Sequence, residues 1–253
     1  MTKELAEVLS QESIASGIYS LTLKVSFAGE VVPGQFVSLY SKDSARLLPR
    51  PISICEFSGE CGTIRLVYRI VGAGTLEFSS LAKGDRIEVL GPLGNGFPVE
   101  EYAGSRVLLV GGGIGIPPLL SCAQKLRNKE FAVGYRSETY LLEDLLKEGA
   151  VYIATEDGSL GTPGNVLDAM RENRVTADVI FSCGPRPMLR ALKTYAEEKG
   201  IPCYVSMEER MACGVGACLA CVCRTTSVDS HSHVRNARIC KDGPVFFAGE
   251  VEL

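Results

Sequence analysis

Short runs of alternating apolar and polar residues fill the first hundred positions of the chain. Glycine and proline separate these runs, which span residues 18–27, 34–40, 50–57, 62–71 and 85–94. A period of two between turn residues predicts antiparallel strands, and this many at such spacing is typical of a closed barrel or a sandwich. We therefore expect residues 1–100 to form an antiparallel β domain.

The pattern changes after residue 100 to longer apolar runs that alternate with helical periodicity. The apolar runs cover residues 107–110, 131–135, 151–155, 178–182 and 202–206. Buried strands alternating with helices predict a doubly wound parallel sheet over residues 101–206. Residues 207–253 contain turn residues and cysteines with little periodicity. We expect them to form a separate lobe organised by a metal, rather than a continuation of the sheet.

Charge and hydropathy exclude two classes of partner. Lys and Arg total 26 against 30 for Asp and Glu, for a net charge of −4, and no long basic run is present. Nucleic acid is therefore not an expected partner. The longest uncharged stretch, residues 107–124, is interrupted by glycines and Pro117-Pro118, so we expect no membrane insertion. The amino terminus lacks the apolar core of a secretory signal, which favours the cytoplasm.

Ten cysteines are present, and four of them crowd into residues 213–223. The spacing Cys213-x4-Cys218-x2-Cys221, with Cys240 further on, is that of a plant-type [2Fe-2S] loop. Gly214 and Gly216 suit a backbone that wraps closely around a cluster. A zinc knuckle is the alternative, but the x4 and x2 gaps fit the iron–sulfur spacing better.

The fourth ligand has several candidates, namely Cys223, Cys240, His231 and His233. Cys223 stands two residues after Cys221 and would present its thiol on the same side, whereas a pair of irons needs ligands from opposite sides. This favours Cys240 and leaves Cys223 as a spectator. The two histidines are not interleaved with cysteines as a Rieske centre requires, so we expect them in an exposed loop.

A glycine-rich turn follows the apolar run 107–110. It contains Gly111, Gly112, Gly113 and Gly115, and the next segment opens with Pro117-Pro118 as a helix would. Backbone amides at such a turn can bind a pyrophosphate. The spacing departs from G-x-G-x-x-G, and Arg136 stands where an acid usually meets the ribose. The sequence therefore predicts a nucleotide site of another subtype, with a turn that needs glycine only for packing as the alternative.

Three further motifs suggest ligand sites. Two of them, Arg50 to Ser53 with Val67 to Arg69 and then Gly74-Thr75, suggest a flavin site, and the third suggests a residue in a ligand crevice. An arginine fork matches a pyrophosphate, and a serine hydroxyl can hydrogen-bond a flavin ring atom. Cys183-Gly184-Pro185 follows the apolar run 178–182, where the carboxyl end of a parallel strand would meet a ligand. Taken singly, each motif is more typical of an ordinary turn, strand edge or buried thiol. The flavin-site candidates are Arg50, Pro51, Ile52, Ser53, Val67, Tyr68, Arg69, Gly74 and Thr75.

Together, Arg50-Pro51-Ile52-Ser53, the glycines at 111–115 and Cys183-Gly184-Pro185 resemble the ferredoxin reductase superfamily. With residues 211–223 and 240–246 added, the whole chain resembles the electron-transfer subunits of NAD-dependent dihydroorotate dehydrogenases of class B. The resemblance implies FAD on the barrel, NAD on the α/β domain and one [2Fe-2S] cluster on the lobe. It also implies an FMN-containing catalytic subunit that oxidises dihydroorotate in pyrimidine biosynthesis, in a heterotetramer with two copies of each chain.

This resemblance implies an oxidoreductase subunit. Nicotinamide exchanges electrons as hydride while a cluster exchanges them singly, so a flavin must stand between them. We expect Ser53 and Cys183 beside the reacting flavin, and electrons to pass from the partner's FMN through the cluster and FAD to NAD. The alternatives are a related reductase subunit that serves ferredoxin, sulfide or hydrogenase partners, and a zinc-bound scaffold without activity.

Two further expectations concern specificity and docking. Glu156 and Asp157 follow the apolar run 151–155, and carboxylates at this place would repel the extra phosphate of NADP. We therefore expect NAD rather than NADP as the cofactor. The alternative is that the two acids only cap a solvated turn. Apolar residues of the lobe either cover the interface with the partner or form the lobe's own core. These residues are Val215, Leu219, Phe246 and Phe247.

Overall fold

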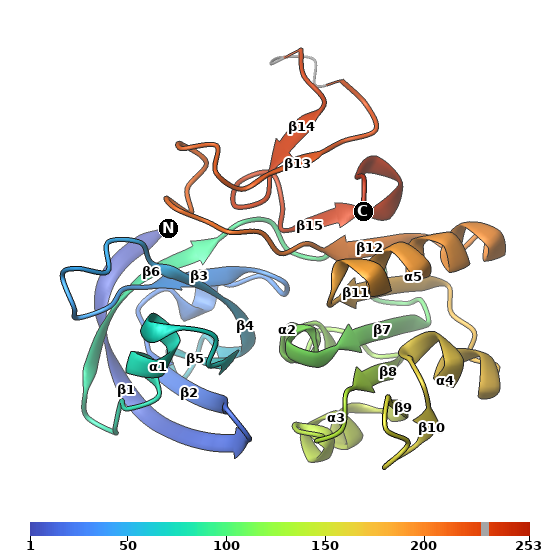
Figure 1. Ribbon diagram of the computed structural model, residues 1–253, viewed down its shortest axis with the longest axis horizontal. Coiled ribbons are helices and arrows are strands. Elements are labelled where there is room, and N and C mark those ends of the chain that lie inside the picture. Colours follow the sequence, from blue (N-terminus) through green and yellow to red (C-terminus); the bar gives the residue numbers. More distant parts are fainter. Residues whose placement is uncertain (229–232) are drawn as a thin grey trace.

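The computed structural model describes residues 1–228 and 233–253. A β-barrel lies beside a mostly parallel sheet, and a small lobe lies above both in Figure 1. His231, one of the ligand candidates, lies outside the described residues. None of the helices in the described ranges is long and apolar enough to cross a membrane.

The amino-terminal half is a closed antiparallel barrel with the strand order β1-β2-β5-β4-β3-β6. Alternation along the strands places leucines and isoleucines inside, such as Leu21, Leu23 and Ile64, which have no exposed surface. The barrel prediction is confirmed, and the residues after Gly72 form a short helix. The elements are β1 (Thr2–Ala15), β2 (Ile18–Lys24), η1 (Ala28–Glu30), β3 (Phe36–Leu39), β4 (Arg50–Ser58), β5 (Thr63–Arg69), α1 (Ala73–Phe78) and β6 (Arg86–Leu93).

A seven-stranded sheet forms the second body, in the order β10-β9-β8-β7-β11-β12-β15. Every residue of β7 is buried, as expected of a central parallel strand covered by helices on both faces. The predicted doubly wound sheet is thus confirmed. Its elements are β7 (Val107–Gly112), η2 (Gly113–Gly115), α2 (Pro117–Ala123), β8 (Lys129–Tyr135), α3 (Leu142–Glu148), β9 (Ala150–Thr155), β10 (Thr162–Pro163), α4 (Val166–Glu172), β11 (Val179–Cys183), α5 (Arg186–Lys199) and β12 (Cys203–Ser206).

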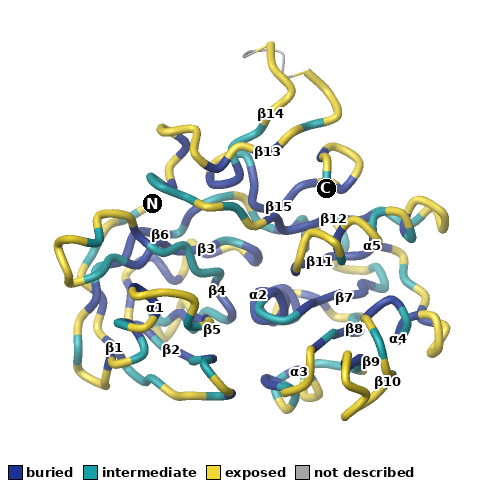
Figure 2. Tube along the Cα trace, in the orientation of Figure 1, coloured by how far each residue is buried: buried dark blue, intermediate teal, exposed yellow. Residues whose placement is uncertain are grey.

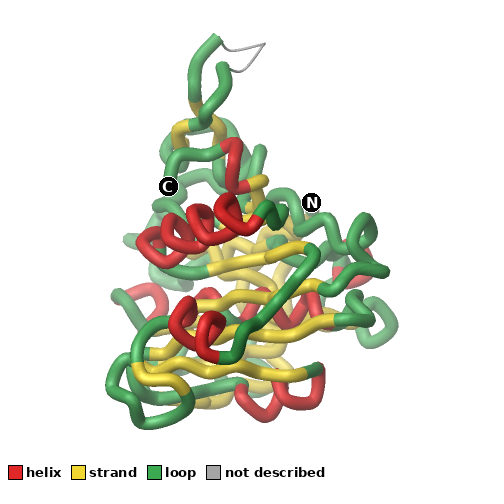
Figure 3. The backbone as a smooth tube through the Cα atoms, turned by 90° about the vertical axis from the view of Figure 1, so that its right-hand side faces the viewer, coloured by secondary structure: helices red, strands yellow, loops and turns green. Residues whose placement is uncertain are grey.

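The lobe contributes one strand to this sheet. It contains β13 (Val222–Arg224), β14 (Asn236–Arg238), β15 (Val245–Phe247) and η3 (Ala248–Glu250). β15 pairs antiparallel with β12, so the expectation that residues 207–253 do not continue the sheet is wrong for this strand. Without β15, β12 would expose an unpaired edge. The β13–β14 hairpin instead projects away from both bodies, as the view in Figure 3 shows.

Several contacts hold the three parts together. Helix α2 is buried along its whole length and lies between the barrel and the sheet, dark blue in Figure 2. Arg65 Nη1 of the barrel lies 2.6 Å from a carboxylate oxygen of Glu56 and 2.9 Å from one of Asp144 on α3. On the side of the lobe, the Asn95 backbone N–H donates to Gly243 O at 2.6 Å. The cavities between these parts are therefore lined by residues far apart in the sequence.

Candidate functional site

A cavity of about 760 Å³ opens between strands β4 and β5, helix α1 and residues 206–211; we call it the barrel cavity. The structure brings all nine flavin-site candidates together along its wall, because they lie on adjacent strands and on the helix that follows them. They are Arg50, Pro51, Ile52, Ser53, Val67, Tyr68, Arg69, Gly74 and Thr75.

Arg50 and Gly74 form the tightest contact of the barrel cavity. A Cβ atom added to Gly74 would lie 2.3 Å from Arg50 Nε, so only glycine lets the guanidinium lie against α1. Thr75 has a structural role, since its hydroxyl donates to Gly72 O at 3.1 Å and accepts from the Val71 backbone N–H at 2.9 Å. The Thr75 side chain therefore shapes the turn, while Arg50 presents a positive charge to the cavity.

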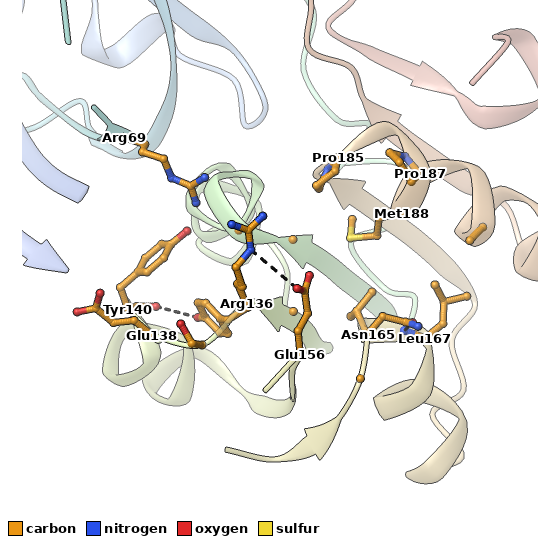
Figure 4. A pocket seen from close by; sticks show the side chains of 18 of the residues that line it. Arg69, Arg136, Glu138, Tyr140, Glu156, Asn165, Leu167, Pro185, Pro187 and Met188 are labelled. Atoms are coloured by element: carbon orange, nitrogen blue, oxygen red, sulfur yellow. Dashed lines mark hydrogen bonds and ion pairs between the residues drawn. The ribbon is translucent and has the colours of Figure 1, made fainter. Parts of the chain in front are cut away.

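A second cavity, of about 750 Å³, lies at the carboxyl ends of β7 and β8; we call it the sheet cavity and show it in Figure 4. Of the four predicted glycines, Gly112 and Gly113 line it. Gly111 and Gly115 do not line it, so the packing interpretation of the turn fits these two, while Gly112 and Gly113 stay candidates for the nucleotide. A Cβ on Gly115 would lie 2.3 Å from Cys183 O, and one on Gly111 would lie 2.8 Å from Ile116 Cγ1.

Arg69 lines both cavities. It enters from the barrel side in Figure 4, and its Nη2 atom would lie 3.6 Å from a Cβ on Gly113. Its charge opposes the effect of burial on Tyr140, whose pKa burial nevertheless raises to about 12. One cation therefore stands at the junction of the two cavities.

The two residues expected beside the reacting flavin have different settings. Ser53 is half-buried and lines the barrel cavity. Cys183 retains only 1% of its surface and is not among the residues lining either cavity. Burial raises the pKa of its thiol far above the ordinary value, so Cys183 remains a neutral thiol. Its carbonyl oxygen packs on Gly115 and helps to fix the end of β11.

The acids after β9 differ in position. Glu156 lines the sheet cavity and lies 3.8 Å from Arg136 Nε, an ion pair drawn in Figure 4. Asp157 does not line the cavity. Its Oδ1 accepts hydrogen bonds from the Ser159 backbone N–H at 3.0 Å and the Ser159 hydroxyl at 2.7 Å, which lower its pKa. The turn-capping interpretation therefore fits Asp157, and the nucleotide interpretation is left to Glu156.

The predicted cluster ligands form two pairs of thiols. The Cys218 backbone N–H donates to Cys213 Sγ at 3.4 Å and the Cys240 backbone N–H donates to Cys221 Sγ at 3.4 Å, and Cys213 and Cys240 also affect each other electrostatically. A [2Fe-2S] centre has two irons with two protein ligands each, so two adjacent pairs suit it. Among the described residues, no three His, Cys, Asp or Glu side chains converge on a single metal ion, whereas a two-iron centre needs only two protein ligands at each iron.

Backbone amides surround these sulfurs. Cys213 Sγ accepts from Val215, Ala217 and Cys218 at 3.3–3.5 Å, and Cys240 Sγ accepts from Gly216 at 3.1 Å. Desolvation opposes ionisation, yet these amides and the Cys218 thiol lower the pKa of Cys213 to about 6. Burial and the neighbouring Cys221 side chain act in the opposite direction on Cys240 and raise its pKa to about 12. Thiolates are the form that binds iron, so Cys213 is already disposed to bind it, and the amide hydrogen bonds to both sulfurs fit the cluster.

Cys223 lies near Cys221 but outside the two thiol pairs. It lies in β13, opposite Ala237 of β14, and burial raises the pKa of its thiol. The apolar residues of the lobe divide as well: Phe246 is buried, whereas Val215, Leu219 and Phe247 are exposed at 37%, 61% and 40%. His233 is exposed. The core interpretation thus fits Phe246, and the exposed residues stay candidates for the interface with the partner.

Several residues that line the cavities were missed by the sequence analysis. Met207, Glu208, Arg210 and Met211 line the barrel cavity. Glu138, Tyr140, Asn165 and Met188 line the sheet cavity. For Glu208 a signal existed, because it comes two residues after the end of a parallel strand, where ligands of open α/β sheets bind.

Comparison with known proteins places the chain in a family. A family model described as the iron-sulfur cluster binding domain of dihydroorotate dehydrogenase B matches residues 208–252. The "Dihydroorotate dehydrogenase B (NAD(+)), electron transfer subunit" of Geobacillus thermodenitrificans is 43% identical to this chain, and the match covers 99% of each. The chain belongs to this family of electron-transfer subunits.

Other relatives agree with this assignment. The dihydroorotate dehydrogenase B electron transfer subunit of Listeria innocua is 44% identical, with 98% of each chain covered. Among solved structures, an NADH-dependent reduced ferredoxin-NADP oxidoreductase matches with a TM-score of 0.86 and 31% identity over 98% of this chain and 90% of that one. A Neisseria gonorrhoeae ferredoxin NADP⁺ reductase, with 15% identity and a TM-score of 0.65, covers 83% of this chain and 95% of its own and shares the fold. The electron-transfer subunit thus has a ferredoxin-reductase fold with an added iron–sulfur lobe.

Proposed function

We propose that this subunit passes electrons from a partner's FMN through a [2Fe-2S] cluster and FAD to NAD. The cluster is held by Cys213, Cys218, Cys221 and Cys240. FAD occupies the barrel cavity and NAD the sheet cavity, which correspond to domains 1–100 and 101–206, with the cluster on 207–253. The observation that carries the proposal is the path of residues 206–211, which line the barrel cavity and lead directly to Cys213.

The order of the carriers follows from their chemistry. FAD exchanges electrons singly with a cluster and as hydride with nicotinamide. Within the barrel cavity we assign the FAD pyrophosphate to Arg50 and the Gly74-Thr75 turn, and we place Ser53 near the reacting ring. Gly112 and Gly113 line the cavity assigned to NAD, where Glu156 faces the adenosine end and disfavours NADP. Arg69 is shared, because it lines both cavities.

The catalytic partner is proposed to dock on the lobe. Cys218 is exposed, and so are the neighbouring Val215 and Leu219, an apolar surface beside a proposed cluster ligand. We assign this surface to the FMN-containing subunit that oxidises dihydroorotate in pyrimidine biosynthesis, in a heterotetramer with two copies of each chain. None of the ten cysteines forms a disulfide, which supports a reducing, cytoplasmic location.

The test compares the purified subunit with the reconstituted complex. The subunit alone, containing FAD and the cluster, should oxidise NADH with artificial acceptors but should not reduce NAD with dihydroorotate. Addition of the FMN subunit should restore dihydroorotate-dependent NAD reduction. Full activity of the single chain without a partner would disprove the two-subunit proposal, and a purified chain without flavin or iron would disprove the assignment of the carriers.

A further inference from the structure

An arginine from another part of the lobe holds one peptide of loop 213–218, which carries two of the proposed cluster ligands. Within the described residues, this loop makes no backbone–backbone hydrogen bond, and one of its carbonyl groups accepts a hydrogen bond from a side chain. The donor is Arg238 Nη1, which lies 3.2 Å from Gly216 O. The orientation of this peptide therefore depends on a side chain 22 positions later, at the end of β14.

Asp242 fixes Arg238 in place. The Nε and Nη2 atoms of Arg238 donate to the two carboxylate oxygens of Asp242 at 3.0 and 2.9 Å, and its backbone N–H donates to the same carboxylate at 2.8 Å. A guanidinium with two parallel hydrogen bonds to one carboxylate keeps a fixed plane. The remaining nitrogen, Nη1, is thereby directed at the loop.

The peptide that Arg238 holds also carries a donor to a proposed cluster ligand. In a trans peptide, the carbonyl of one residue and the N–H of the next point in opposite directions. Gly216 O faces Arg238, and on the other side of the same peptide the Ala217 N–H donates to Cys213 Sγ at 3.3 Å. The N–H of Gly216 itself donates to Cys240 Sγ at 3.1 Å. Gly216 thus lies between one sulfur of each thiol pair.

Close packing at Gly216 joins the loop to the turn formed by residues 238–242. Gly216 is buried and has a φ of +83°, a conformation that favours glycine. A Cβ atom there would lie 2.8 Å from Lys241 Cβ and 3.5 Å from Arg238 Nη1. Because the turn also contains Cys240, a shift of Arg238 would be felt at sulfurs on both sides of the site.

We propose that Arg238, fixed by Asp242, is a positioning residue that raises the reduction potential of the cluster by aiming the Ala217 N–H at Cys213 Sγ. An added electron increases the negative charge on the ligand sulfurs, and N–H donors aimed at them stabilise this charge. The reduced form is therefore favoured, which eases the entry of electrons from the partner's FMN. The inference rests on the proposed function, since it needs the [2Fe-2S] cluster on the four cysteines.

The positive charge of Arg238 would by itself also favour the reduced cluster, and Asp242 separates the two explanations. If charge alone mattered, Asp242→Asn would remove a negative charge and raise the potential. If orientation matters, the same substitution releases Arg238 and lowers the potential. We expect a fall in both Asp242→Asn and Arg238→Gln. Reduction should become about tenfold less favourable, as for one lost hydrogen bond to a charged group, which is about 59 mV for a one-electron couple.

The experiment is a redox titration of the holoprotein, with the reduced cluster followed by EPR spectroscopy. The matched controls are Arg224→Gln and Glu252→Gln, which remove the same two charges from a pair of the lobe whose closest atoms are 4.0 Å apart. Both controls should keep a potential near the native value. After exchange into D₂O, deuterium modulation of the EPR echo reports the amides beside the sulfurs. It should weaken in the variants of Arg238 and Asp242 and persist in the controls.

A native or raised potential in either Arg238→Gln or Asp242→Asn would overturn the proposal. Loss of iron and sulfide from both variants would also overturn it, because the pair would then serve to hold the cluster rather than to set its potential. If only one variant loses its iron, the potential of the other decides. A native chain purified without iron and sulfide would instead disprove the cluster assignment itself.

Discussion

Gly74→Ala tests the FAD site through a single steric contact. The new Cβ atom would lie 2.3 Å from Arg50 Nε and 2.7 Å from Arg50 Cζ, closer than any real packing contact. The backbone at Gly74 is not left-handed, so the substitution adds no backbone strain. The guanidinium must therefore move away from α1, and with it the positive charge that we assign to the FAD pyrophosphate.

The size of the effect follows from the hydrogen bond that is lost. A hydrogen bond between charged groups contributes about 1.5–3 kcal/mol, which corresponds to roughly 10- to 150-fold in the dissociation constant of FAD. Arg50→Ala removes the same interaction outright and should reach the upper end. Titration of the apoprotein with FAD, followed by flavin fluorescence, measures both variants.

Gly104→Ala is the matched control, because a Cβ atom there meets nothing within 4 Å and the residue lies outside both cavities. It should bind FAD as tightly as the native chain. If Gly74→Ala and Arg50→Ala also bind FAD with native affinity, the assignment of the pyrophosphate to Arg50 is wrong.

Two further predictions concern the cluster and the nucleotide. Cys240→Ser should lose iron and sulfide, because it removes one member of the Cys221–Cys240 pair, whereas Cys223→Ser should retain both; the opposite result would make Cys223 the fourth ligand. The native complex should use NAD in preference to NADP. Glu156→Gln should narrow this preference by about fivefold, or ~1 kcal/mol, because Arg136 would lose the carboxylate that neutralises it and could then attract the extra phosphate of NADP. Asp157→Asn is the control and should leave the preference unchanged, since Asp157 lies outside the cavity. The measurement is kcat/KM with each cofactor, and equal values for NAD and NADP in the native complex would contradict the reasoning.

The sequence predicted those parts of the site whose residues follow a local pattern. The barrel cavity was foreseen because Arg50 to Ser53 and Val67 to Arg69 lie on neighbouring strands, where alternation fixes which side chains share a face. The grouping of the cysteines was foreseen in the same way, because three of them lie in one short loop.

Long-range contacts could not be predicted in this way. The need for glycine at position 74 comes from a side chain 24 positions earlier, and Glu208 becomes a cavity residue only where the end of β12 meets the barrel. Likewise, the pairing of β15 with β12 depends on a sheet edge left open by a different part of the chain. Such contacts depend on how distant parts of the chain meet, and the periodicity of the sequence carries no information about this.

The short segment from Asp242 to Phe247 joins the lobe to both the barrel and the sheet. On one side, Asp242 O and Gly243 O accept hydrogen bonds from Asn95 of the barrel, and on the other side β15 extends the sheet through β12. The same segment begins two residues after Cys240, a proposed cluster ligand. A cluster anchored there cannot swing on a tether between two docking positions. The distance between the cluster and the barrel cavity is thus set by folding, and electrons can enter without any large motion of the lobe.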